Sequence, residues 1–198
     1  MKIKICGLFR KEDIAYINEA RPDYAGFVFA ESRRQVFPAE AASLRDGLAP
    51  GIVPVGVFVD APIAEIAALY RDGVIEIAQL HGSEDGEYIT LLKQECAIPV
   101  IKTIIHQPSG PFAGGQFPLA DYYLLDSGAG SGKTFNWDLI DPGAMDKPWF
   151  LAGGIGIENI KEAMALKPYG IDLSSAAETN GIKDRKKILQ LTERIKNE

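Results

Sequence analysis

The sequence predicts a single α/β domain over residues 1–198, folded as a small (β/α)8 barrel, and three observations favour this fold. Apolar runs of strand length recur along the chain. Amphipathic helical stretches lie between most of them, which is typical of a parallel sheet covered by helices. The 198 residues suffice for one sizeable core but are too few for two comfortable α/β domains.

Eight short apolar segments are the expected strands, which is the number that closes a barrel. In chain order they cover residues 2–6, 24–29, 54–59, 75–80, 100–105, 122–125, 149–152 and 171–174. The first ends at Cys6, and Gly7 follows at once. The sixth is the run of two tyrosines and two leucines that precedes Asp126.

Six helices are expected between these strands, because apolar residues recur there at spacings of three and four. In chain order they cover residues 12–20, 39–47, 63–71, 84–95, 158–166 and 184–195. Pro38, Pro62 and Ser83 mark the first turns of the second, third and fourth helices.

The connection between the fifth and sixth strands, residues 106–118, carries three prolines and three glycines. We therefore expect a loop in place of the fifth helix, which also helps to explain how a barrel fits into so short a chain. A doubly wound open sheet is the alternative fold. It predicts a glycine-rich dinucleotide loop after the first strand, and residues 6–10 are not one.

Composition narrows the classes of function. The 21 basic and 27 acidic residues give a net charge of −6, which disfavours nucleic acid as a partner. Neither a signal peptide nor an apolar run of membrane-spanning length is found, so we expect a cytoplasmic protein without membrane contact. The two cysteines, Cys6 and Cys96, lie too far apart to suggest a disulfide framework or a redox motif, and Cys96 is interpreted as a packing residue.

Metal and nucleotide sites are not expected. His81 and His106 share no ligand spacing with cysteines or carboxylates. Residues 128–134 resemble a phosphate-binding P-loop but have Ser127 where its first glycine would stand, so we interpret them as a lid.

The active site of such a barrel lies where the strands end, so polar residues at those positions are the candidates. Cys6 can act as base or nucleophile if its surroundings lower its pKa, whereas the alternative is a buried thiol that only packs. Asp126 leaves an apolar strand, which favours a neutral acid able to donate a proton, whereas the alternative is a turn residue. The two lie on opposite sides of the predicted barrel mouth, which suits proton transfer between adjacent carbons of a bound sugar.

Other strand ends offer binding groups. Gly153 and Gly154 after the seventh strand, and Ser174 and Ser175 after the eighth, stand where many barrels bind phosphate, although the glycines could serve tight turns alone. Arg34 is a candidate clamp for a carboxylate, and Arg33 is expected in solvent. His81 could orient a substrate or Cys6, or bond backbone carbonyls. The remaining polar residues at strand ends are Ser32, Asp60, Gln79, Lys102, His106 and Asp172.

Eight segments, in this order, resemble the phosphoribosylanthranilate isomerase family of tryptophan biosynthesis. They are residues 4–7, 26–29 with 32–34, 55–59, 79–82, 124–126, 130–137, 151–155 and 171–175. The resemblance spans the whole chain, and agreement of eight segments in the same order is not expected by chance.

The resemblance implies an intramolecular aldose–ketose isomerase that needs no cofactor or metal and acts on a phosphosugar. It implies the Amadori rearrangement of N-(5-phosphoribosyl)anthranilate, with Asp126 as general acid, Cys6 as general base and Arg34 on the anthranilate carboxylate. His81 and Asp172 match family site positions. The phosphate would bind at residues Gly153, Gly154, Ser175 and Ala176.

Three positions depart from the family pattern. Ala176, Asn136 and Gln35 stand where the family usually has Gly, Asp and Tyr. Because none is the proposed acid or base, we expect altered affinity with activity retained.

Two other functions stay open. A histidine-pathway aminoaldose isomerase would use two aspartates, and Cys6 argues against it; a noncatalytic phosphometabolite-binding barrel would need neither Cys6 nor Asp126. The sequence does not distinguish a monomer from a homodimer.

Overall fold

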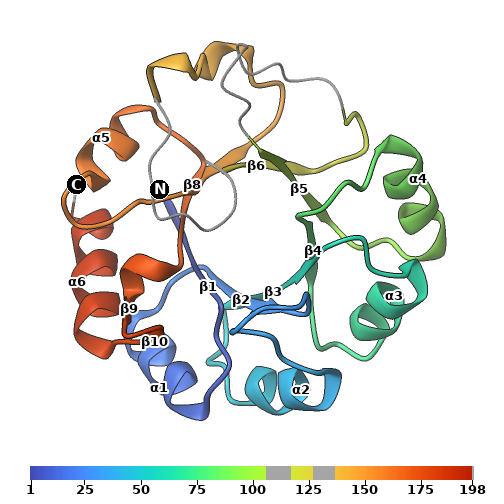
Figure 1. The fold of residues 1–198 in the computed structure, drawn as a ribbon, viewed down its shortest axis with the longest axis horizontal. Coiled ribbons are helices and arrows are strands. Elements are labelled where there is room, and N and C mark those ends of the chain that lie inside the picture. The colour runs from blue at the N-terminus through green and yellow to red at the C-terminus, as the bar shows by residue number, and fades with distance from the viewer. Residues whose placement is uncertain (106–116, 127–136, 198) are drawn as a thin grey trace.

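A computed structural model describes residues 1–105, 117–126 and 137–197. A ring of strands occupies its centre, and helices surround the ring (Figure 1). The strands are β1 Lys2–Cys6, β2 Tyr24–Val28, β3 Val53–Phe58, β4 Ile77–Leu80, β5 Val100–Ile105, β6 Tyr122–Asp126, β7 Trp149–Leu151 and β8 Gly170–Leu173. Each strand pairs in parallel with the next and β1 pairs with β8, so the sheet closes into the predicted barrel.

All eight predicted strands are confirmed, with ends that differ from the prediction by at most two residues. The largest difference is at β4, which begins at Ile77 instead of residue 75. The backbone amides of Val74 and Ile75 both donate to the Leu69 carbonyl, at 2.9 and 3.4 Å, so these residues belong to the turn that closes the preceding helix.

The six predicted helices are also confirmed. They are α1 Lys11–Ala20, α2 Pro38–Asp46, α3 Ile63–Arg71, α4 Gly86–Glu95, α5 Ile160–Ala165 and α6 Arg185–Lys196. Helix α4 begins two residues later than predicted because Asp85 is its N-cap and accepts a hydrogen bond of 2.9 Å from the Tyr88 amide. Glu84, predicted as its first residue, instead turns its side chain toward Lys102.

Short elements complete the described chain. They are the 3-10 helices η1 Trp137–Leu139, η2 Pro142–Ala144 and η3 Ser175–Ala177, and the paired strands β9 Glu178–Thr179 and β10 Ile182–Lys183. The sequence did not predict the β9–β10 hairpin between β8 and α6. The loop predicted in place of the fifth helix lies outside the described residues over 106–116, and so do His106, the lid at 128–134 and Asn136.

Apolar side chains from alternate strand residues fill the interior of the barrel. They are Tyr24, Val55, Ile77, Ile101, Leu124, Phe150 and Ala152. Aromatic rings gather at the amino end, where the Tyr24 and Tyr169 hydroxyls lie 3.0 Å apart and Tyr122 packs on Tyr169.

Polar residues occupy the same interior closer to the carboxyl end. Gln79 and Thr103 lie two residues beyond Ile77 and Ile101, and therefore on the same inward faces, because strand side chains alternate with a period of two. The described polar residues at the carboxyl ends of the parallel strands therefore share one rim of the cylinder.

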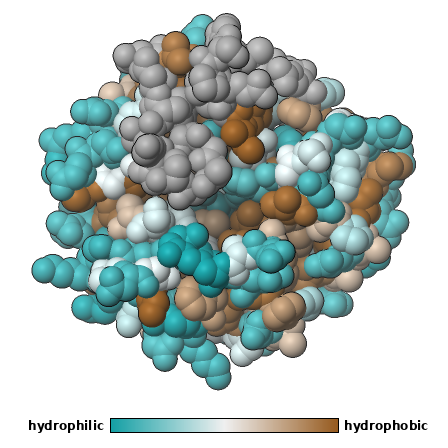
Figure 2. All heavy atoms as spheres, in the orientation of Figure 1, coloured by the Kyte–Doolittle hydropathy of each residue, from teal (hydrophilic) through white to brown (hydrophobic). Residues whose placement is uncertain are grey.

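Figure 2 shows hydrophilic residues spread over one face of the molecule, with hydrophobic residues in smaller groups among them. Exposed large hydrophobic side chains such as Phe37, Leu91 and Ile182 come from separate parts of the chain. Within the described ranges, no helix combines the length and apolar character needed to cross a membrane.

Candidate active site

Cys6 is the last residue of β1 and is buried, with 8% of its surface exposed. It stands in register with Gly26 of β2. A Cβ atom on Gly26 would lie 2.7 Å from the Cys6 sulfur, so only glycine leaves room for the thiol at this position. Gly7 follows with a φ of 82°, a left-handed conformation that turns the chain away from the strand.

The charges around Cys6 oppose one another. Burial raises the pKa of the Cys6 thiol, and it outweighs the positive charges of Lys4 and Lys183, which act to lower that pKa. The Asp172 carboxylate also raises it. The cations that favour a thiolate here are the buried ammonium groups of Lys4 and Lys183.

Asp172, on β8, is the register partner of Lys4 on β1. The Lys4 Nζ atom lies 2.9 Å from Asp172 Oδ1, and the Lys4 side chain is fully buried. This contact is an ion pair, but its angles are not those of a well-formed hydrogen bond. Asp172, which the sequence analysis predicted as a substrate-binding residue, is seen here to neutralise a charge inside the barrel.

Arg34 is held by Glu178, the first residue of β9. The Arg34 Nε and Nη2 atoms donate to the two carboxylate oxygens at 2.7 and 2.9 Å, and Gly7 makes room for this side chain. Lys183 donates to the same carboxylate at 2.7 Å. Burial alone would raise the pKa of Glu178, but hydrogen bonds from Arg34 and Lys183 outweigh it and lower that pKa to about 2.

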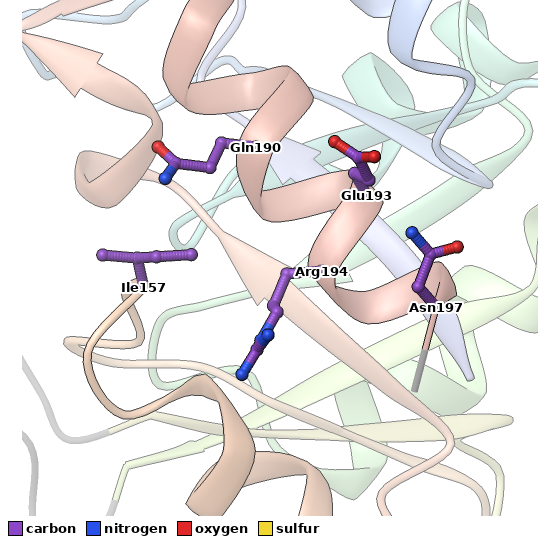
Figure 3. A pocket seen from close by; sticks show the side chains of 5 residues that line it. All are labelled: Ile157, Gln190, Glu193, Arg194 and Asn197. Carbon is purple, nitrogen blue, oxygen red and sulfur yellow. The ribbon is translucent and has the colours of Figure 1, made fainter.

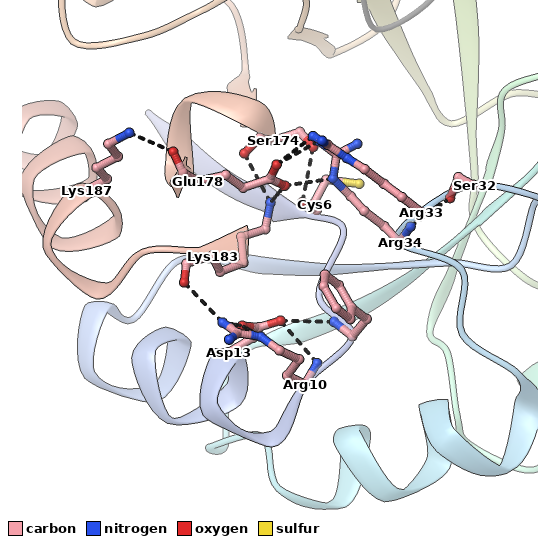
Figure 4. Close-up of polar contacts among 11 residues, drawn as sticks. Cys6, Arg10, Asp13, Ser32, Arg33, Arg34, Ser174, Glu178, Lys183 and Lys187 are labelled. Carbon is pink, nitrogen blue, oxygen red and sulfur yellow. Dashed lines mark hydrogen bonds and ion pairs between the residues drawn. The ribbon is translucent and has the colours of Figure 1, made fainter. Parts of the chain in front are cut away.

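Arg33 joins this cluster, at 2.9 Å from Glu178. Its side chain is 59% exposed, so it lies largely in solvent as predicted while still forming an ion pair. Figure 4 shows Arg33, Arg34 and Lys183 converging on the carboxylate of Glu178 beside Cys6.

His81 follows β4, and its Nε2 atom lies 3.5 Å from Asp126 Oδ2 at the end of β6. Its Nδ1 atom lies 3.0 Å from the Gln79 amide nitrogen and 3.1 Å from Thr103 Oγ1. Burial lowers the pKa of His81 despite the nearby Asp126 charge, which favours a neutral ring. Because an amide nitrogen only donates, this assignment of Gln79 places the ring proton on Nε2, facing Asp126.

The loops after β7 and β8 carry the predicted phosphate site. Gly153 and Gly154 have φ values of 87° and 66°, which glycine adopts most readily. Asn159 fixes this loop, because its side chain accepts from the Gly156 amide at 2.8 Å and donates to the Gly154 carbonyl at 3.0 Å.

Ser175 and Ala176 form the first turn of η3. Among the described residues, no hydrogen bond is donated by the backbone amides of Gly153, Gly154, Ser175 or Ala176. The Ala176 methyl lies 3.6 Å from the position that a Cβ on Gly156 would take, so it reaches across toward the β7 loop.

The other strand ends have structural contacts. Asp60 after β3 accepts hydrogen bonds of 2.8 Å from both the amide and the hydroxyl of Ser83. Lys102 on β5 forms a buried ion pair of 2.9 Å with Glu84. The Ser32 hydroxyl oxygen accepts a hydrogen bond of 3.2 Å from the Arg34 backbone amide. The Gln35 side-chain amide donates one of 3.0 Å to the Phe29 carbonyl. These contacts stabilise the loops at the rim.

Sequence reasoning missed three charged residues of the site: Lys4, Glu178 and Lys183. The inward position of Lys4 could have been predicted from the sequence, because Lys4 precedes Cys6 by two residues on the same strand and so shares its inward face. The position of Glu178 could not have been predicted, because it lies in a hairpin of two-residue strands and its partner Arg34 is 144 residues away in the sequence.

Two cavities lie away from the rim. One of about 610 Å³, on the outside of the barrel, is lined by Ile157, Gln190, Glu193, Arg194 and Asn197 (Figure 3). The other, of about 550 Å³, is lined by Lys93, Lys147 and neighbouring residues at the amino ends of the strands. The described lining of neither cavity includes a predicted site residue, so the position of the site rests on the side chains at the strand ends.

The sequence is similar to known proteins over nearly its whole length. Residues 3–194 match the family model described as "N-(5'phosphoribosyl)anthranilate (PRA) isomerase". A protein of that name from Endomicrobium trichonymphae is 45% identical over 192 residues, which cover 96% of this chain and 95% of the relative.

Solved structures agree as well. The phosphoribosyl anthranilate isomerase of Thermus thermophilus superposes with a TM-score of 0.88 at 34% identity, covering 100% of this chain and 99% of that one. A second isomerase structure, in complex with reduced 1-(o-carboxyphenylamino)-1-deoxyribulose 5-phosphate, gives 0.78 at 27% identity with both chains fully covered (100%).

Proposed function

The chain belongs to the N-(5'-phosphoribosyl)anthranilate isomerase family, and we propose that it catalyses the Amadori rearrangement of N-(5'-phosphoribosyl)anthranilate with Cys6 as base and Asp126 as acid. The product is 1-(2-carboxyphenylamino)-1-deoxyribulose 5-phosphate. The observation that carries the proposal is that a thiol ends β1 and a carboxyl group ends β6, both at the carboxyl rim of one closed barrel.

The reaction opens the sugar ring and then moves a proton. Asp126 donates a proton to the ring oxygen, the bond from that oxygen to carbon 1 breaks, and the anthranilate nitrogen forms a protonated Schiff base with carbon 1. The Cys6 thiolate then removes the proton on carbon 2, and the released electron pair forms the enolamine. Tautomerisation of the enolamine gives the ketone at carbon 2.

Asp126 and His81 form the acid side of the site. The His81 Nε2 atom, 3.5 Å from Asp126 Oδ2, holds the carboxyl group at the rim and offers it a proton donor once it is ionised.

The two ends of the substrate require separate anchors. The phosphate binds to the amides of Gly153, Gly154, Ser175 and Ala176, which no described residue occupies. Arg34 binds the anthranilate carboxylate through the donors that Glu178 leaves unused, since Glu178 takes Nε and Nη2. Anchors at both ends hold the sugar carbons between the acid and the base.

Three variants test this proposal in an assay that follows loss of phosphoribosylanthranilate. We expect Cys6→Ser and Asp126→Asn each to lose about 10²-fold or more in kcat, as is typical when a positioned acid or base is removed. Cys96→Ser is the matched control, because Cys96 is the C-cap of α4 and lies away from the rim. It should retain full turnover.

The outcomes separate the competing functions. Full turnover in both rim variants would refute the assigned residues while keeping the activity. Absence of turnover in the wild-type protein would refute the activity itself, and turnover of the histidine-pathway aminoaldose instead would favour the related isomerase.

A further inference from the structure

Lys4 lies fully buried inside the barrel, although burying a charged ammonium group there removes its hydration at a large cost in free energy. Only Asp172, at 2.9 Å, pairs with it among the described acidic side chains. Replacing such a pair with apolar residues is often neutral or stabilising, so a pair that is retained calls for a reason beyond stability.

The position of Lys4 beside Cys6 suggests a functional reason for this buried ion pair. Lys4 lies two residues before Cys6 on β1, so both side chains point into the barrel, with Lys4 one layer deeper. Its ammonium group interacts with the Cys6 sulfur as well as with Asp172. Among the described residues, the Lys4 Nζ atom has no well-formed hydrogen bond, so its buried N–H donors remain available near the sulfur.

Donors fixed in advance next to an atom that becomes charged stabilise that charge without reorganisation. Burial holds Cys6 in its neutral thiol form, and a neutral thiol cannot accept a proton from carbon. The described charged groups that act on Cys6 come from four elements: Lys4 on β1, Asp172 on β8, Lys183 on β10, and Arg34 in the loop after β2. Of the three cations, Lys4 exerts the strongest influence on the thiol, and Asp172 opposes it.

We propose that Lys4 is a positioning residue that makes the Cys6 thiolate accessible inside the buried site, and that Asp172 sets how much of the ammonium charge reaches the sulfur. This inference rests on the proposed function of Cys6 as the base. The Cys6 S–H proton leaves to solvent, the sulfur keeps the electron pair, and the Lys4 donors turn to the thiolate. Deprotonation of carbon 2 then restores the thiol.

The rate of Cys6 alkylation by iodoacetamide tests the inference without substrate. In a Cys96→Ser background Cys6 is the only thiol, since the chain has two cysteines. While the thiolate is the minor form, the rate at a fixed pH is proportional to its population. We expect Lys4→Met to slow alkylation about 10-fold or more, and Asp172→Asn to speed it several-fold.

The direction of the change in alkylation rate distinguishes stabilisation of the thiolate by Lys4 from a purely structural role of Lys4. A lysine needed only for packing would loosen the site when removed and expose Cys6, so alkylation would become faster. Lys183→Met is the matched control, because it removes a second fully buried ammonium with a weaker influence on Cys6 and should slow the reaction less than Lys4→Met.

An unchanged or faster rate in folded Lys4→Met protein, checked by circular dichroism, would overturn the proposal. If that variant does not fold, Asp172→Asn decides alone, and a slower or unchanged rate overturns it. Expected alkylation rates in a protein that does not turn over phosphoribosylanthranilate would keep this inference and refute the proposed activity instead.

Discussion

Gly26 sets the position of the Cys6 thiol that we propose as the base, and replacing Gly26 with alanine perturbs that position with one methyl group. The added Cβ would lie 2.7 Å from the Cys6 sulfur, 3.0 Å from its Cα and 3.1 Å from its Cβ. Non-bonded carbon contacts are ordinarily no closer than about 3.5 Å, so the overlap with sulfur is about 0.8 Å (3.5 minus 2.7).

The surroundings prevent an easy escape from this overlap. Gly26 and Cys6 are register partners, and the Gly26 carbonyl accepts hydrogen bonds from Gly7 at 2.9 Å and Leu8 at 3.1 Å. Either the thiol leaves its rotamer or the last rung between β1 and β2 opens. Overpacking of this kind costs about 1–3 kcal/mol, which lowers the Tm of a domain of this size by about 2–12 °C.

Activity should fall further than stability. A displacement near 1 Å at a reacting group can reduce the rate about 10²-fold, so we expect kcat to fall about 10- to 100-fold with KM little changed, because the proposed phosphate anchors lie on the loops after β7 and β8. Urea unfolding and steady-state kinetics measure the two effects. Gly86→Ala is the control: its Cβ would meet nothing within 4 Å, and alanine in a helix should preserve or slightly raise stability. Wild-type kcat and stability in Gly26→Ala would refute this reasoning.

Two further variants test the supports of the rim. Glu178→Gln should destabilise the protein at pH 7 by about 3 kcal/mol, because it leaves buried Lys183 and Arg34 without their carboxylate. Since the pKa of Glu178 falls from 4.5 unfolded to about 2 folded, its contribution is fully present above pH 4.5 and is lost as pH falls toward 2. The stability gap between variant and wild type in urea titrations should therefore shrink over that window, and a gap independent of pH would contradict the assignment. Asn159→Ala removes two loop hydrogen bonds, at 2.8 and 3.0 Å, and should raise KM with a stability loss of about 2 kcal/mol; an unchanged KM would separate this loop from phosphate binding.

The barrel could be predicted because its evidence is local. Each strand is a short apolar run and each helix carries its own apolar periodicity, so the order of elements gives the topology. Cys6 and Asp126 follow from the same reasoning, because a residue that ends a parallel strand lies at the rim.

Depth inside the barrel could not be predicted in this way. Lys2 and Lys4 share one face of β1, yet Lys2 is 47% exposed and pairs with Asp23 at the amino end, whereas Lys4 is fully buried. The alternation of side chains specifies which face of a strand a residue occupies. It does not specify how far along the barrel axis the apolar interior extends, and therefore whether a given lysine is buried. Glu178 was missed for a different reason, since its partner Arg34 is distant in sequence and two-residue strands have no periodicity to detect.

A crystal structure of this protein with reduced 1-(o-carboxyphenylamino)-1-deoxyribulose 5-phosphate would test the central claim most directly. We expect the sugar carbons to lie between the Cys6 sulfur and the Asp126 carboxyl group. The sulfur should lie within about 3–4 Å of carbon 2, and the carboxyl group within about 3–4 Å of the oxygen that closed the sugar ring. The phosphate should lie on the amides after β7 and β8, and the aryl carboxylate on Arg34. A sugar bound away from either Cys6 or Asp126 would contradict the account.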